Sequence, residues 1–130
     1  MKTTEHVFTG GKQTDSRKRE HYYSEKIIRE IVKSYDKNIH EAPVSWGHSG
    51  DTRKHLQDRI PAAGWVQKLK NKGIELYAEI DWTEAGRREV EADNYKKFSA
   101  AFYLPDSPHN PVPGKWSLRH VALLGAEPPA

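Results

Sequence analysis

The 130-residue chain contains no cysteine. Disulfide bonds, a thiolate nucleophile and a cysteine-based zinc site are therefore excluded. A reducing compartment fits this composition. Any catalysis must come from hydroxyl, imidazole, carboxylate or amine side chains.

Long apolar runs are also missing. No stretch approaches the ~18 residues typical of a membrane span, and the N-terminus has no hydrophobic signal region. The sequence therefore predicts neither a membrane span nor export, and no membrane partner is expected.

The charge excess is small, with 21 basic and 18 acidic residues giving a net charge of +3. One basic cluster, Lys12–Arg19, has a composition that can contact phosphate. Its glycine-flanked, polar sequence is more typical of a solvated loop. Nucleic-acid binding is therefore an alternative that the sequence does not favour.

What remains is an ordinary globular composition, with 35% apolar residues, 30% charged residues and four tryptophans. The length predicts one domain over residues 1–130 with a single core. No internal repeat and no linker divides the chain.

The clearest elements are a helix and a hairpin. Ser24 is a suitable N-cap for a helix over 25–35, where an apolar stripe should cover the core or, if exposed, form an interface. Residues 64–70 and 74–82 form a hairpin around a turn at 71–73, and the second arm alternates strictly between apolar and polar residues. Thr83 should cap a second helix over 84–94.

Four further strands are expected, with polar or proline-rich loops between them. The strands fall at residues 5–10, 43–48, 97–104 and 115–125, and the loops at 12–23, 51–62 and 105–114. Antiparallel strands with two helices indicate an α+β fold, in which a curled antiparallel sheet or small barrel is flanked by helices.

The strand over 97–104 carries a hydroxyl among apolar residues. Ser99, Ala101 and Tyr103 should share one face, and Phe98, Ala100 and Phe102 the other. A small hydroxyl in a packed strand is ordinarily structural, so Ser99 gains significance only from its neighbours.

Two of the seven histidines have unusual settings. His48 and His120 lie at or near strand ends among apolar residues, whereas surface exposure is expected for the remaining five: His6, His21, His40, His55 and His109. Together with Ser99, His48 and His120 supply a nucleophile, a base and a group that could orient the base. A metal site from His48, Asp51 and His55 competes, but their spacing is not helical and the segment resembles a loop.

An ordered set of motifs extends over nearly the whole chain: "EAPVSWGHSG", "GWV", "LYAEIDWTEAG", "YKKFSAAFY" and "LRHVALLGAEPPA". In this order they resemble the prohead, or capsid-maturation, proteases of Mu-like phages, which are often made as protease–scaffold fusions. The wider group is similar to assemblin, the herpesvirus maturation protease, whose catalytic residues come in the order His, Ser, His.

The resemblance implies a serine endopeptidase without a cofactor or a metal. Carried over motif by motif, Ser99 is the nucleophile, His48 the general base and His120 the residue that orients His48. Small alanines beside Ser99 would let substrate backbone approach. Assemblins place oxyanion-stabilising arginines downstream of the third residue; the stretch after His120 has none, so this group is unassigned.

The resemblance also implies biological context. Substrates would be phage scaffold and major capsid proteins, and the site of action the assembling procapsid in the cytoplasm of the bacterial host. Assemblins act as dimers, so self-association is expected. A C-terminal scaffold region would follow the protease in a fused protein, and cleavage after Ala130 would suit a narrow pocket. The alternative is a catalytically inactive, protease-like module that binds scaffold or capsid.

Overall fold

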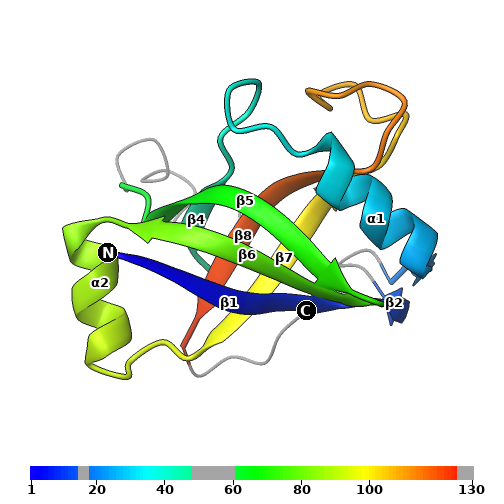
Figure 1. The fold of residues 1–130 in the computed structure, drawn as a ribbon. Helices are drawn as coiled ribbons and strands as arrows, with labels where there is room; N and C mark the ends of the chain where they lie inside the picture. The colour runs from blue at the N-terminus through cyan, green and yellow to red at the C-terminus, as the bar shows by residue number, and fades with distance from the viewer. Residues whose placement is uncertain (15–17, 48–60, 126–130) are drawn as a thin grey trace.

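A six-stranded sheet dominates the computed structural model, which describes residues 1–14, 18–47 and 61–125 (Figure 1). The strand order is β1-β6-β5-β4-β8-β7. All neighbours are antiparallel except β4 and β8, which are parallel. The strands are β1 (Lys2–Thr9), β4 (Pro43–Trp46), β5 (Gly64–Lys72), β6 (Glu75–Trp82), β7 (Lys97–Tyr103) and β8 (Ser117–Leu124).

The sheet curls strongly into a half-barrel. The pairing register shifts once in the β1–β6 ladder, once in β5–β6 and once in β7–β8. Such bulges bend a strand and increase its twist. The edge strands β1 and β7 thereby approach each other, and the rings of Phe8 and Phe102 pack edge to face with centroids 4.8 Å apart. The expected α+β fold with a curled sheet is confirmed.

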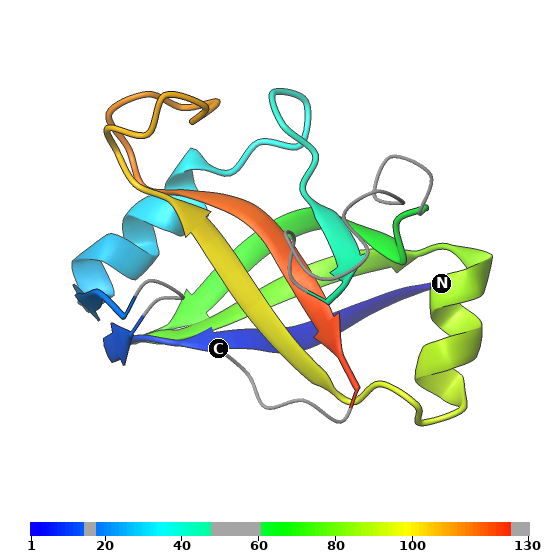
Figure 2. The ribbon, with the colours of Figure 1, turned by 180° about the vertical axis from the view of Figure 1, so that it is seen from behind.

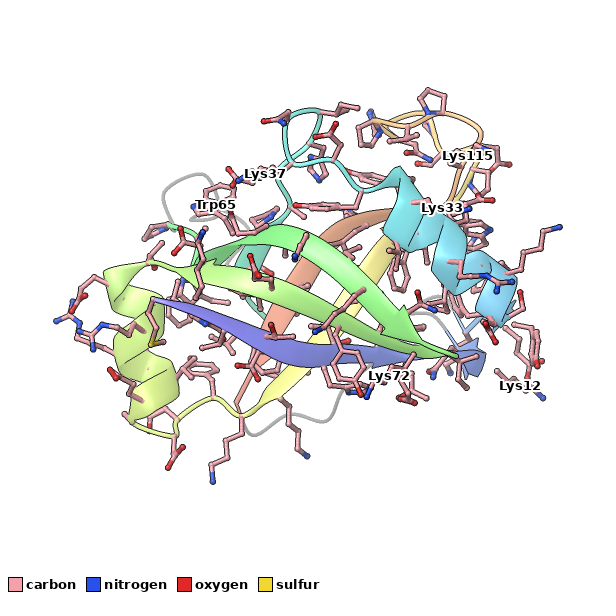
Figure 3. The ribbon with its side chains drawn as sticks, viewed as in Figure 1. Lys12, Lys33, Lys37, Trp65, Lys72 and Lys115 are labelled. Carbon is pink, nitrogen blue, oxygen red and sulfur yellow. The ribbon has the colours of Figure 1, made fainter. Side chains whose placement is uncertain are left out.

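The β5–β6 hairpin follows the alternation of its sequence. In β6 the side chains of Leu76, Ala78, Ile80 and Trp82 are buried. The intervening residues face outward, and Lys72 of β5 lies opposite Glu75 of β6 in the ladder. This outer face, with exposed Trp65 and Lys72, is visible in Figure 3. The turn lies at residues 73–74 rather than at the predicted 71–73, because β5 extends to Lys72 and β6 begins at Glu75.

Helix α1 (Glu25–Ser34) begins where the sequence predicted. The Ser24 hydroxyl accepts a hydrogen bond from the Ile27 N–H at 3.2 Å, which satisfies one of the donors left at a helix start. Ile28 and Ile31 are fully buried, and the helix packs on β5 and β8. The prediction that its apolar stripe covers the core is therefore confirmed, and the exposed stripe that would have made it a candidate interface is not found.

Tyr35 ties the end of α1 to the sheet. Its hydroxyl donates to the Val66 carbonyl at 2.5 Å and accepts from the Ala42 N–H at 3.0 Å. Burial raises the pKa of this phenol to about 12. One side chain thus fixes the segment leading into β4 against β5.

Helix α2 (Glu84–Glu91) is shorter than predicted but starts at the expected cap, where the Thr83 hydroxyl accepts from the Gly86 N–H at 3.2 Å. The same hydroxyl lies 2.9 Å from the Ala63 carbonyl oxygen. Gly86 touches that carbonyl, because a Cβ built there would lie 1.9 Å from the Ala63 oxygen. A glycine is therefore needed for α2 to dock on the start of β5.

The sequence analysis did not predict one feature, a small two-stranded ribbon. Residues predicted as a polar loop include β2 (Gly11–Thr14) and β3 (Glu20–Tyr23), which pair as a separate two-stranded sheet. Alternation at these positions is masked by polar residues, and the ribbon is held by Tyr23, whose ring lies 5.0 Å from Phe8 and 5.3 Å from Trp116. Most of the loop expected at 51–62, and the tail after residue 125, lie outside the described residues.

Candidate functional site

Ser99 lies near the middle of the edge strand β7, on the face away from the half-barrel interior. Phe98 and Phe102 point to the interior, where they lie 6.1 Å from Trp82 and 4.8 Å from Phe8, centroid to centroid. Because successive side chains alternate, Ser99 and Ala101 share the opposite face, as predicted. The aromatic anchors hold the strand, and with it the direction of the Ser99 side chain.

His120 lies on the same face of the neighbouring strand. In the β7–β8 ladder Ser99 pairs with Ala122, and Ala101 pairs with His120. Ser99 and His120 are therefore diagonal neighbours, whose Cα atoms are typically about 7–8 Å apart in an antiparallel pair. Both side chains are buried, each with a relative exposure of 6%.

The third strand of this region is β4, which leads toward His48. Ser45 pairs with Ala122, so Ser45, Ala122 and Ser99 form a row of small side chains across three adjacent strands. β4, β8 and β7 are seen together from behind in Figure 2. The Gly47 N–H donates to the Leu123 carbonyl at 3.1 Å, and the Ser45 hydroxyl donates to the Gly47 carbonyl at 2.6 Å.

His48 itself, the next residue after Gly47, lies outside the described residues. The structure thus places two of the three predicted catalytic residues, Ser99 and His120, on one face of the sheet. The strand that precedes the third, β4, lies next to β8. The His48–Ser99 contact stays a prediction.

The competing metal site also falls outside this range, since His48, Asp51 and His55 all belong to residues 48–60. Within the described part of the chain, no group of three or more His, Cys, Asp or Glu side chains could hold a metal ion. The basic cluster is described only in part; there, Lys12 forms an ion pair with Glu20 across the β2–β3 ladder at 3.4 Å.

Other histidines have local partners. His6 Nε2 lies 2.9 Å from Glu75 Oε1, and the Thr9 hydroxyl donates to the same oxygen at 2.5 Å. These two contacts lower the pKa of the Glu75 carboxyl. The side chains of His6 and Thr9 are exposed and that of Glu75 is half-buried; together they link β1 to β6, which is a structural role.

No helix in the described ranges is long and apolar enough to cross a membrane.

The fold and the placement of Ser99 and His120 define an α+β half-barrel with a buried serine hydroxyl and a buried imidazole on one face.

Residues 6–124 match the family model of the Mu-like prophage I protein, N-terminal domain. This match spans most of the chain, which therefore belongs to that family. The phage relationship predicted from the motifs is confirmed; the family description names no activity. Neither the curated proteins nor the solved structures gave a match.

Proposed function

We propose that this domain is a serine endopeptidase that cleaves scaffold and capsid proteins during phage prohead maturation, with Ser99 as nucleophile, His48 as general base and His120 as the residue that orients His48. The observation that carries the proposal is the shared, buried face of Ser99 and His120. From diagonal ladder positions on one face, a hydroxyl and an imidazole could both contact a second imidazole.

The surroundings of Ser99 suit peptide chemistry. Ser45, Ala101 and Ala122 are small, so a substrate backbone can come close to the nucleophile. β4 is followed by Gly47, whose N–H donates to the carbonyl of Leu123, the residue after Ala122. His48 follows directly, which supports its role as base.

The reaction would be acyl transfer. His48 takes the hydroxyl proton as Ser99 Oγ attacks the scissile carbonyl, and then returns it to the leaving amine. Water hydrolyses the acyl-enzyme by the same route. His120 accepts a hydrogen bond from the other nitrogen of His48 and steadies the imidazolium; because a neutral imidazole does this less well than a carboxylate, turnover should be modest.

Coexpression of the full-length protein with the scaffold and major capsid proteins of its own phage tests the proposal. The parent should convert both substrates to shorter products. Ser99→Ala should lower cleavage by roughly 10⁴-fold or more while its circular dichroism and urea midpoint stay close to the parent's. Thr4→Ala, which removes an exposed hydroxyl from β1, is the matched control and should cleave normally.

Equal cleavage by Ser99→Ala and the parent would reject the assignment of Ser99. If neither protein cleaves the substrates but both co-purify with the scaffold, the domain is a non-catalytic assembly module.

A further inference from the structure

The face of β7 and β8 that carries Ser99 continues toward the end of the two strands at which the charged residue Arg119 lies. Ala101 and Tyr103 follow Ser99 on that face of β7. Exposure increases in this direction: Ser99 is buried, Ala101 and Tyr103 are half-buried, and Arg119 of β8 is exposed. A peptide can therefore approach the region from the Arg119 end.

Arg119 occupies a special position in its strand. Ala101 pairs with His120 and Phe102 pairs with Leu118, which leaves Arg119 as the extra residue of a bulge. Bulges redirect a side chain locally and recur beside functional sites. Here the Arg119 guanidinium carbon lies 5.8 Å from the centroid of the Tyr103 ring, in a cation–π arrangement.

His40, from the segment between α1 and β4, supports both partners. Its Nε2 lies 3.2 Å from the Arg119 carbonyl oxygen. Its ring also packs against the Tyr103 ring, with centroids 6.2 Å apart and planes at 69°. The guanidinium is thus positioned by the Tyr103 ring and by the backbone of Arg119, which His40 contacts.

We propose that Arg119, held over Tyr103, is a specificity residue that binds an acidic side chain of the peptide substrate. This inference rests on the proposed function of Ser99. The Arg119 guanidinium carbon lies over the Tyr103 ring, and the guanidinium N–H donors lie in one plane, in the fork geometry that matches a carboxylate.

The spacing along β7 sets the position of that side chain. Four residue steps along the strand lead from Ser99 to Tyr103 and span about 13 Å. An extended substrate has the same rise per residue. The acidic residue therefore lies three to five positions from the scissile bond.

The first test maps cleavage sites in a peptide library made from a bacterial protein extract, read by mass spectrometry. The parent should cut most often where Asp or Glu lies three to five positions from the cut. Arg119→Gln should lose this preference and cleave acidic peptides about two- to fivefold less well, the range of an exposed ion pair. Arg119→Glu should favour Lys or Arg instead. Arg88→Gln, which removes an exposed arginine from α2, should keep the acidic preference.

Parent cleavage without acidic enrichment, or enrichment that survives in Arg119→Gln, would overturn the inference and leave the peptidase assignment intact. Loss of all cleavage in the parent would instead count against the proposed function.

The second test does not need catalysis. In Ser99→Ala labelled with ¹⁵N, acetyl-Glu-(Ala)₄-amide at millimolar concentration should shift the Arg119 Nε–H resonance saturably, and the matched glutamine peptide should not. Equal shifts from both peptides, or none, would contradict a carboxylate site at Arg119.

Discussion

Replacing Gly86 by alanine sets two effects of opposite sign against each other. In a helix interior, Gly→Ala ordinarily stabilises by about 1 kcal/mol, because alanine loses less backbone entropy. At Gly86, however, the new Cβ would lie 1.9 Å from the Ala63 oxygen and 2.8 Å from its carbonyl carbon. Both atoms belong to the backbone, so neither can rotate away.

Relief of this clash requires α2 to move from the start of β5 by more than 1 Å. That movement strains the hydrogen bonds of Thr83, whose N–H and hydroxyl lie 3.0 Å and 2.9 Å from the Ala63 oxygen. Overpacking typically costs about 1–3 kcal/mol, and each weakened hydrogen bond about 1 kcal/mol. After the helix-propensity gain of about 1 kcal/mol is subtracted, we expect Gly86→Ala to destabilise the fold by about 2–4 kcal/mol.

Urea denaturation followed by circular dichroism measures this difference. The midpoint should fall for Gly86→Ala, and should change little for Arg88→Ala at an exposed position of the same helix. A Gly86→Ala protein as stable as the parent, or more stable, would refute the close contact between α2 and Ala63.

Three further predictions concern stability. Tyr35→Phe leaves the Ala42 N–H and the Val66 carbonyl without their phenol partner and should cost about 2–3 kcal/mol by urea denaturation. Because the pKa of Tyr35 is raised in the folded protein to about 12, its contribution is full below the unfolded value near 10 and is lost as pH rises from about 10 to 12. Allowing for solvent screening of a half-buried phenol, this adds about 1–2 kcal/mol of alkaline destabilisation that the Phe variant should lack; parallel pH profiles would contradict it. Asn110→Ala removes the amide that donates to the carbonyls of residues 104 and 115 and accepts from the Ser117 hydroxyl, and should lower stability by about 2–4 kcal/mol, with faster amide exchange over residues 104–116; unchanged exchange there would argue against this hub. Ser24→Ala should cost about 1 kcal/mol through the lost cap of α1, and a variant as stable as the parent in thermal unfolding would show that the cap contributes nothing.

Local patterns were sufficient for most of the fold. The β6 alternation and the Ser24 and Thr83 caps each depend on residues close in sequence, and the structure keeps them. The β2–β3 ribbon was missed because its stability comes from Tyr23 packing on Phe8 and Trp116, which are distant in the chain. The bulges that curl the sheet were not predictable either, since no single residue type marks them.

The candidate site shows the same division. That Ser99 and Ala101 share a face follows from strand periodicity. That His120 lies diagonal to Ser99 depends on the β7–β8 register, which the long proline-rich connection does not fix by itself. Arg119 was overlooked because in a regular strand it would face away from His120; only the bulge brings it beside Tyr103.

Covalent labelling by a fluorophosphonate tests the central claim most directly, because the reagent needs an activated hydroxyl but no knowledge of the substrate. Ser99 Oγ would bond to phosphorus, fluoride would leave, and the hydroxyl proton would pass to His48. Intact-mass and peptide analysis should find one adduct, on Ser99 of the folded protein, that is absent from Ser99→Ala, strongly slowed in His48→Ala and lost on denaturation in urea. No adduct on the folded parent, or labelling of Ser99 at the same rate in His48→Ala, would contradict a hydroxyl activated by that imidazole.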